Sequence, residues 1–192
     1  MGLFTLLCND DQGLIGVWVV IVNRPMKSLK RIDLLHLKAA QGWLELGNSA
    51  EAEAELHEIG PETRKHPDVL EMRWKIYAQA QKWDICVEMA ESLVDSAPRR
   101  STGWLYLAAS FQALHLTEEA YETLAGVASN FPDNVAIPYQ LACYAVELNL
   151  LEDARLWLEQ AIEGGDSKEL KLLALKDPAV QSLWRHLKGD EG

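Results

Sequence analysis

Cysteine and histidine are the side chains of this 192-residue chain that could serve as nucleophiles, general bases or metal ligands. Three cysteines and five histidines occur, but none stands in a CxxC or HExxH spacing, so neither a zinc site nor a disulfide framework is expected. The motifs GxSxG and GxGxxG and the phosphate-binding P-loop are absent as well. No spacing supports a pair such as Cys143 with His115. We therefore expect no metal and no cofactor, and an enzyme of unknown type is only a remote alternative.

The regular feature of the sequence is a spacing of 34 residues, which ties together four columns. The first column holds mostly small residues, and its members are Ala52, Cys86, Ala120 and Ala154. Twelve positions upstream lies a second, again mostly small column, consisting of Ala40, Trp74, Ala108 and Ala142. Three positions further on lies a mostly aromatic column of Trp43, Tyr77, Phe111 and Ala145, and the units close at Arg64, Pro98, Pro132 and Asp166. Self-similarity at such a period indicates a repeat fold.

The third unit carries the fullest form of the pattern, with Trp104, Leu107, Ala108 and Phe111, then Ala120, Leu124 and Pro132. It resembles the signature of the tetratricopeptide repeat (TPR), W-x2-L-G-x2-Y, A-x3-F and P. The resemblance covers about residues 33–166. It implies an all-α, right-handed α-solenoid of about four helix pairs, in which small residues let the two helices of a unit approach closely. The second unit departs from this pattern, because bulky Trp74 stands opposite Cys86.

The register predicts first and second helices at about 32–46 and 49–60, 68–80 and 83–96, 101–114 and 117–129, and 135–148 and 151–163. Local signals agree with these bounds. Asn48 precedes Glu51 at the spacing of a capping box, and Pro132 is followed by Asn134 as a stop and a cap.

Residues 1–25 lie outside the repeat and contain an uncharged apolar run at 14–22. Nine residues are too few to span a bilayer as a helix, which needs about 20, and the preceding stretch fits neither a signal peptide nor a myristoylation site. Two interpretations remain. Translation starts at Met26 and the upstream start is mis-assigned, or the segment is a hydrophobic arm that docks on the solenoid or on another subunit.

The period runs through residues 26–166 as four units and then stops. Asp177 and Pro178 form a good helix start, followed by one apolar face of Val180, Leu183, Trp184 and Leu187. We expect residues 167–192 to provide a C-terminal capping helix and tail, because a solenoid needs a covered end. This combination resembles a group of small bacterial TPR proteins, and the resemblance supplies no specific function.

The resemblance also implies that the first helices line a concave groove. Its carboxylate clamp for chaperone tails is missing, since the phases that would hold Lys, Asn and Arg carry other residues. We expect an extended or helical peptide to bind through apolar contacts and amide hydrogen bonds, anchored by Tyr106 and Tyr139. Alternatively, both tyrosines pack between first helices or under the C-terminal cap. The groove candidates are Leu37, Gln41, Met72, Lys75, Leu105, Tyr106, Gln112, Tyr139 and Gln140.

Charge and cysteine usage bear on the partner and the compartment. The formal net charge is −11, with 29 acidic and 18 basic residues, which disfavours nucleic acid and favours a neutral or basic peptide. An odd number of cysteines without CxxC spacing suits a reducing cytoplasm. The expected function is a protein–protein interaction scaffold or adaptor. The alternative is a chaperone-like protein that shields apolar segments of a secreted or assembling partner.

Overall fold

The computed structural model describes residues 28–164, and within this range the chain forms helices and no strands. The predicted N-terminal arm and the C-terminal capping helix lie outside the described residues. The eight α-helices are α1 (Arg31–Glu45), α2 (Ser49–His57), α3 (Pro67–Gln79), α4 (Trp83–Ser96), α5 (Ser101–Ala113), α6 (Thr117–Ala125), α7 (Ala136–Glu147) and α8 (Leu151–Gly164), and a short 3-10 helix, η1 (Ala128–Asn130), follows α6.

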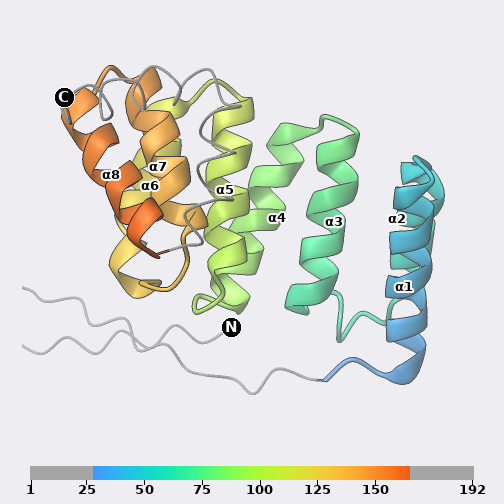
Figure 1. Ribbon diagram of the computed structural model, residues 1–192. Helices are drawn as coiled ribbons and strands as arrows, with labels where there is room; N and C mark the ends of the chain where they lie inside the picture. The colour runs from blue at the N-terminus through green and yellow to red at the C-terminus, as the bar shows by residue number, and fades with distance from the viewer. Residues whose placement is uncertain (1–27, 165–192) are drawn as a thin grey trace, which may run out of the picture.

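The helices form four consecutive pairs arranged in a row, from α1 and α2 at one end to α7 and α8 at the other (Figure 1). Each pair also packs against the next one, through α2 with α3, α4 with α5, and α6 with α7. The predicted all-α solenoid of four helix pairs is thereby confirmed over the described residues.

Two helices end several residues earlier than the register predicts. α2 ends at His57 rather than near 60, and α6 ends at Ala125 rather than near 129. Pro61 disfavours a helical conformation for the residue before it, and Gly126 is a poor helix former at the end of α6. The chain leaves α6 through η1 instead.

The turn between the two helices of a unit repeats in detail. Gly47, Gln81, His115 and Asn149 stand 34 residues apart, and each has a positive φ, of 78°, 57°, 62° and 60° respectively. In every unit, the residue after this position donates its backbone N–H to the backbone carbonyl of the residue five positions earlier, at 2.8–2.9 Å. The acceptors are the residues of the mostly aromatic column, namely Trp43, Tyr77, Phe111 and Ala145. This is the hydrogen bond of a Schellman cap. Four equal caps therefore set four equal turns.

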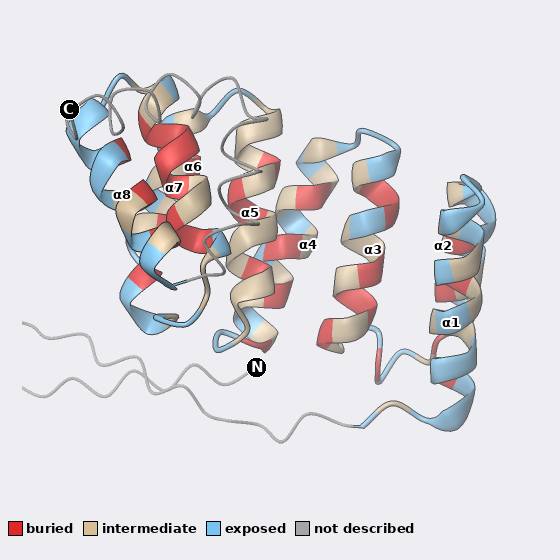
Figure 2. Cartoon of the chain, viewed as in Figure 1, coloured by how far each residue is buried: buried red, intermediate tan, exposed pale blue. Residues whose placement is uncertain are grey.

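The columns of small residues form the contact between paired helices. Ala40, Ala52, Cys86, Ala108, Ala120, Ala142 and Ala154 are all 0% exposed. Figure 2 shows many buried residues on the helices in the middle of the row, whereas exposed residues predominate on α1 at one end.

Trp74, the bulky member of a small-residue column, is accommodated because its indole turns towards the next unit. Its ring stacks on Tyr106 of α5, with centroids 3.9 Å apart and planes 7° from parallel. The indole Nε1 donates to the Ser110 hydroxyl at 2.9 Å. The Cys86 thiol lies 3.7 Å from the Trp74 backbone carbonyl oxygen. The tryptophan therefore joins two units and does not separate α3 from α4.

The first unit closes without the proline of later units. Arg64 donates from Nε to the Ile59 carbonyl at 3.2 Å and from a terminal nitrogen to the His57 carbonyl at 3.5 Å. A cation at this place satisfies backbone acceptors at the end of α2. Nearby, the buried Thr63 hydroxyl donates to the buried Asp33 carboxylate at 3.0 Å, which ties the start of α1 to the loop after α2.

Candidate partner-binding surface

The four first helices, α1, α3, α5 and α7, are linked along the row by hydrogen bonds between units. Gln79 donates to the Leu44 carbonyl at 3.4 Å, Trp74 donates to Ser110 at 2.9 Å, and Gln112 donates to Glu147 at 2.6 Å. The partners are 35 or 36 residues apart in sequence. We call the surface that these helices present the first-helix surface.

The predicted groove residues differ in how far they are exposed. Gln41 and Lys75 are exposed, and Met72 is buried at 8% exposure. Met72 packs with Val69 and Ile76 in the core shared by the first two units, so it offers little surface to a partner. The remaining candidates are partly exposed, namely Leu37, Leu105, Tyr106, Gln112, Tyr139 and Gln140.

Both predicted tyrosine anchors make contacts within the protein. Tyr106 stacks on Trp74 between α3 and α5, and burial together with the charge of Glu71 raises its pKa to about 12. Tyr139 packs against the cluster of Ala142, Cys143 and Leu158 in the last unit. Tyr106 therefore packs between two first helices, as the alternative interpretation predicts. Only part of the Tyr106 ring is left exposed for a partner.

An ion-pair cluster at the start of α3 and α5 is not indicated by the sequence pattern. Arg100 lies 2.6 Å from a carboxylate oxygen of Asp68 and 3.3 Å from one of Glu71. The hydrogen bond to Asp68 contributes most to the raised pKa of Arg100, and the charge of Glu71 adds to it. The 32-residue separation of Arg100 and Asp68 is close to the repeat period and is the one signal that could have suggested this pair.

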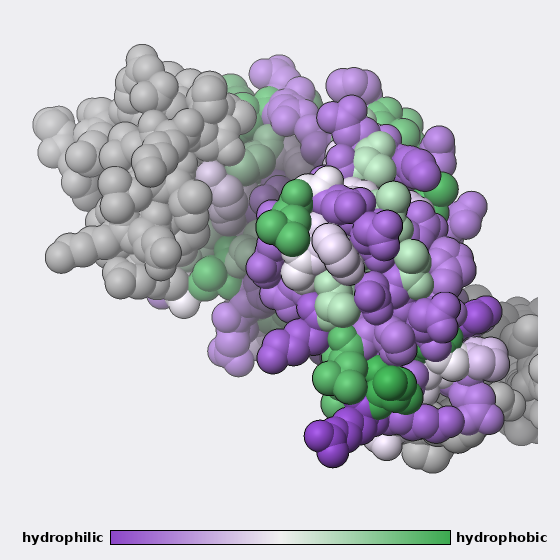
Figure 3. Space-filling view, turned by 90° about the vertical axis from the view of Figure 1, so that its right-hand side faces the viewer, coloured by the Kyte–Doolittle hydropathy of each residue, from purple (hydrophilic) through white to green (hydrophobic). Residues whose placement is uncertain are grey.

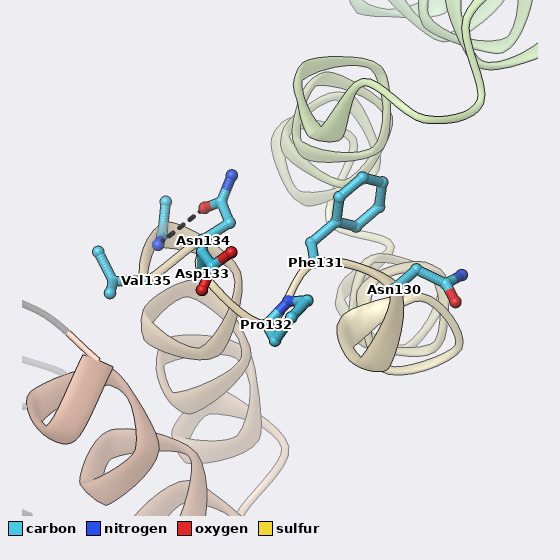
Figure 4. A pocket seen from close by; sticks show the side chains of 7 residues that line it. Asn130, Phe131, Pro132, Asp133, Asn134 and Val135 are labelled. Carbon is cyan, nitrogen blue, oxygen red and sulfur yellow. Dashed lines mark hydrogen bonds between the residues drawn. The ribbon is translucent and has the colours of Figure 1, made fainter.

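Two cavities lie away from the first-helix surface. One, of about 430 Å³, is lined by the turn between α6 and α7, residues 130–136. Figure 4 shows its side chains spread along this turn, with the Asn134 side chain accepting from the Ala136 N–H at 3.0 Å. The other, of about 290 Å³, lies between α6 and α8 and is lined by Tyr121, Asp153, Leu156, Trp157 and Gln160. No groove candidate lines either cavity.

The cysteine and histidine side chains that could do chemistry are not assembled into a reactive centre in the described residues. Cys86 and Cys143 are buried, and burial raises the pKa of the Cys86 thiol to about 11, the opposite of the shift that activates a nucleophile. His115 occupies an exposed turn position. Residues 28–164 contain no group of three or more His, Cys, Asp or Glu arranged to hold a metal ion.

Paired helices, phased small residues and repeated caps define a TPR-like α-solenoid. Solved structures share this fold. A MamA fragment beginning at residue 41, from Desulfovibrio magneticus RS-1, is similar with a TM-score of 0.63 at 15% identity, over 84% of this chain and 94% of that one. A double mutant of MamA RS-1 has the same TM-score and identity, over 84% and 93% of the two chains. The thermophilic TPR protein TTC0263 of Thermus thermophilus has a TM-score of 0.61 at 17% identity, over 81% and 82%.

Comparisons at the level of sequence add no relative to these structures. No protein-family model matches the chain, and no curated protein matches it. Among the helices of residues 28–164, none combines the length and the apolar character needed to cross a bilayer.

Proposed function

We propose that this protein is a protein–protein interaction scaffold that binds a peptide or a partner helix on the first-helix surface. The observation that carries the proposal is the continuity of this surface: α1, α3, α5 and α7 are hydrogen-bonded unit to unit, and they leave Gln41 and Lys75 exposed along it. A continuous row of helices offers an extended site, as peptide-binding solenoids require.

The chemistry of the surface suggests the character of its ligand. Amide side chains from two units, Gln41 and Gln140, can donate to and accept from a peptide backbone. Leu37 and Leu105 supply partly exposed apolar contacts. The net charge of −11 attracts a basic partner at long range and repels an acidic one.

The test is peptide selection followed by site-directed change of the exposed positions. A phage-displayed library of random peptides is selected on the full chain, and enriched peptides are titrated by fluorescence anisotropy. We expect Gln41→Ala combined with Lys75→Ala to weaken binding at least about tenfold, which corresponds to about 1.4 kcal/mol. These two residues are better probes than Tyr106, because removal of Tyr106 would also disturb the stack on Trp74.

A matched control separates the surface from the overall charge. Lys65→Ala makes the same charge change in the exposed loop between α2 and α3, and it should leave the affinity unchanged. Far-UV circular dichroism checks that all variants stay folded. Equal losses from Lys65→Ala and from the first-helix variant would show that the peptides do not depend on the exposed first-helix residues, and the proposed site would be rejected.

A further inference from the structure

In the second, third and fourth units, one face of the first helix is covered by the preceding unit. Val69 and Ile76 of α3 pack with Ala52, Leu56 and Ile59 of the first unit. Gly103 of α5 is so close to α4 that an added Cβ would lie 3.2 Å from Leu93 and Val94 atoms. In α7, Ile137, Leu141 and Tyr144 pack with Ala120 and Leu124 of the third unit. The column of Val69, Gly103 and Ile137 thus packs against the preceding unit in each case.

The equivalent face of α1 has no preceding unit in the described residues and is apolar. Leu35 lies 34, 68 and 102 positions before Val69, Gly103 and Ile137, and it is 57% exposed. Ile32 and Leu46 lie on the same face at helical spacing, with 54% and 77% exposure, and Trp43 borders them at 37%. Figure 3, which views the molecule from this end, shows hydrophobic patches between hydrophilic side chains. A terminal unit that faces water needs a polar outer side, and exposed Ile32, Leu35 and Leu46 interrupt that side of α1.

We propose that the apolar segment 14–22 of the same chain covers this face of α1 and acts as the N-terminal cap of the solenoid. The segment has the sequence LIGVWVVIV, without a charged residue. The face made by Ile32, Leu35 and Leu46 is apolar at its centre, and the exposed Arg31 and Lys38 lie at its edge. Burying both surfaces against each other removes two apolar areas from water at once. A second copy of the chain could instead pack its α1 against this α1. That arrangement would cover both helices but would leave segment 14–22 of each copy without an apolar partner.

The lengths allow this contact within one chain. Residues 23–27 connect the segment to Ser28, the first described residue, and five residues reach at most about 18 Å. α1 has 15 residues and is therefore about 22 Å long. The connection can thus return the segment to the N-terminal part of the exposed face, and its nine residues, about 30 Å when extended, are long enough to cover the rest.

Photo-crosslinking in the full chain tests the contact directly. A benzophenone amino acid replaces Leu35, and an equal mixture of ¹⁴N- and ¹⁵N-labelled protein is irradiated and analysed by peptide mass spectrometry. We expect crosslinks to peptides from residues 14–22 in which both halves carry the same isotope. The matched control places the probe at Leu156 of α8, which is similarly exposed at 56%, and its crosslinks to residues 14–22 should be at least tenfold fewer. Mixed-isotope crosslinks, equal labelling from Leu156, or no crosslink to the segment would each overturn the proposal.

A thermodynamic cycle gives an independent measurement. Leu35→Asp with Leu46→Asp should lower the Tm of the full chain by about 4 °C or more, and so should Val19→Asp with Ile21→Asp. Because both pairs disrupt one contact, their combination should cost no more than either alone. Additive losses would show that the two surfaces do not meet, and the proposal would fail.

Discussion

At the scale of single residues, Trp74 changes how two units are joined. A small residue at this position would leave only helix-to-helix contact within the unit, whereas the indole reaches α5 and combines a ring stack with a hydrogen bond. Stacked aromatic pairs contribute about 0.5–1.5 kcal/mol beyond the apolar area that they bury. Trp74 should therefore add to the connection between the second and third units that α4 and α5 already make.

Two substitutions separate the contributions of Trp74. Trp74→Ala removes the stack and leaves a cavity, and we expect it to lower the free energy of unfolding by about 3 kcal/mol. Trp74→Phe keeps a ring against Tyr106 but loses the bond to Ser110, at a cost of about 1 kcal/mol. Urea denaturation followed by circular dichroism measures both. Equal losses in the two variants would mean that the stack contributes nothing.

Asp33 gives a second prediction at this scale. Burial disfavours its ionised form, but hydrogen bonds from the Thr63 hydroxyl and the Lys30 and Gly60 backbone N–H groups, with the charge of Lys30, outweigh burial and lower the pKa of Asp33 below 3.8. A lowered folded-state pKa contributes stability that is present above the unfolded value and is lost as the pH falls through the folded value. We expect Asp33→Asn to be less stable than the parent at pH 7, with a difference that shrinks below about pH 4. Urea titrations at neutral and progressively more acidic pH check this, and a constant difference would contradict it.

At the scale of structural elements, the turn between paired helices combines one geometry with four different residues. Positive φ is easy for glycine and is costly for most other residues. Gly47 satisfies this requirement, whereas Gln81 and His115 occupy the same conformation with ordinary side chains. The repeat therefore keeps the turn although its residues at this position differ.

Opposite substitutions in two units test the turn. Gly47→Ala should lower the free energy of unfolding by about 1 kcal/mol, because alanine is strained at a positive φ. Steric crowding does not contribute, since nothing lies within 4 Å of the added Cβ. His115→Gly should raise stability by about 0.5 kcal/mol, because strain relief exceeds the entropy cost of glycine. Thermal unfolding of both variants provides the comparison. A gain from Gly47→Ala would contradict the assigned conformation.

At the scale of the whole molecule, each unit contacts only its neighbours, so a local change should spread over a limited distance. Ala120 is 0% exposed in the contact between α5 and α6. Ala120→Trp should overpack this contact and cost about 2 kcal/mol or more. Hydrogen exchange should become faster in α5 and α6 and in the adjoining α4 and α7, while α1 and α2 keep their rates. Uniformly faster exchange would indicate that the solenoid unfolds as a single unit.

Much of the architecture can be predicted because it follows from local patterns. The register predicts α4 at 83–96, where it is found, and the starts of α5 and α6 match as well. The predicted ends of α2 and α6 are wrong, because helix ends depend on the competition between the last turn and the following loop. The phase of the repeat predicts which helices form the first-helix surface. The phase does not predict that the Met72 side chain is buried in the core.

The sequence by itself determined the period, the helix pairs and the small-residue contacts, because small and large residues 34 positions apart can pack repeatedly in only a few ways. Only the tertiary structure decided how side chains leave their helices: Trp74 towards Tyr106, Thr63 towards Asp33 and Arg100 towards Asp68. These contacts join residues about one repeat apart, and their rotamers depend on neighbours that a sequence does not place in space. The exposure of Leu35 on α1 has the same origin, since it follows from the absence of a preceding unit in the described residues.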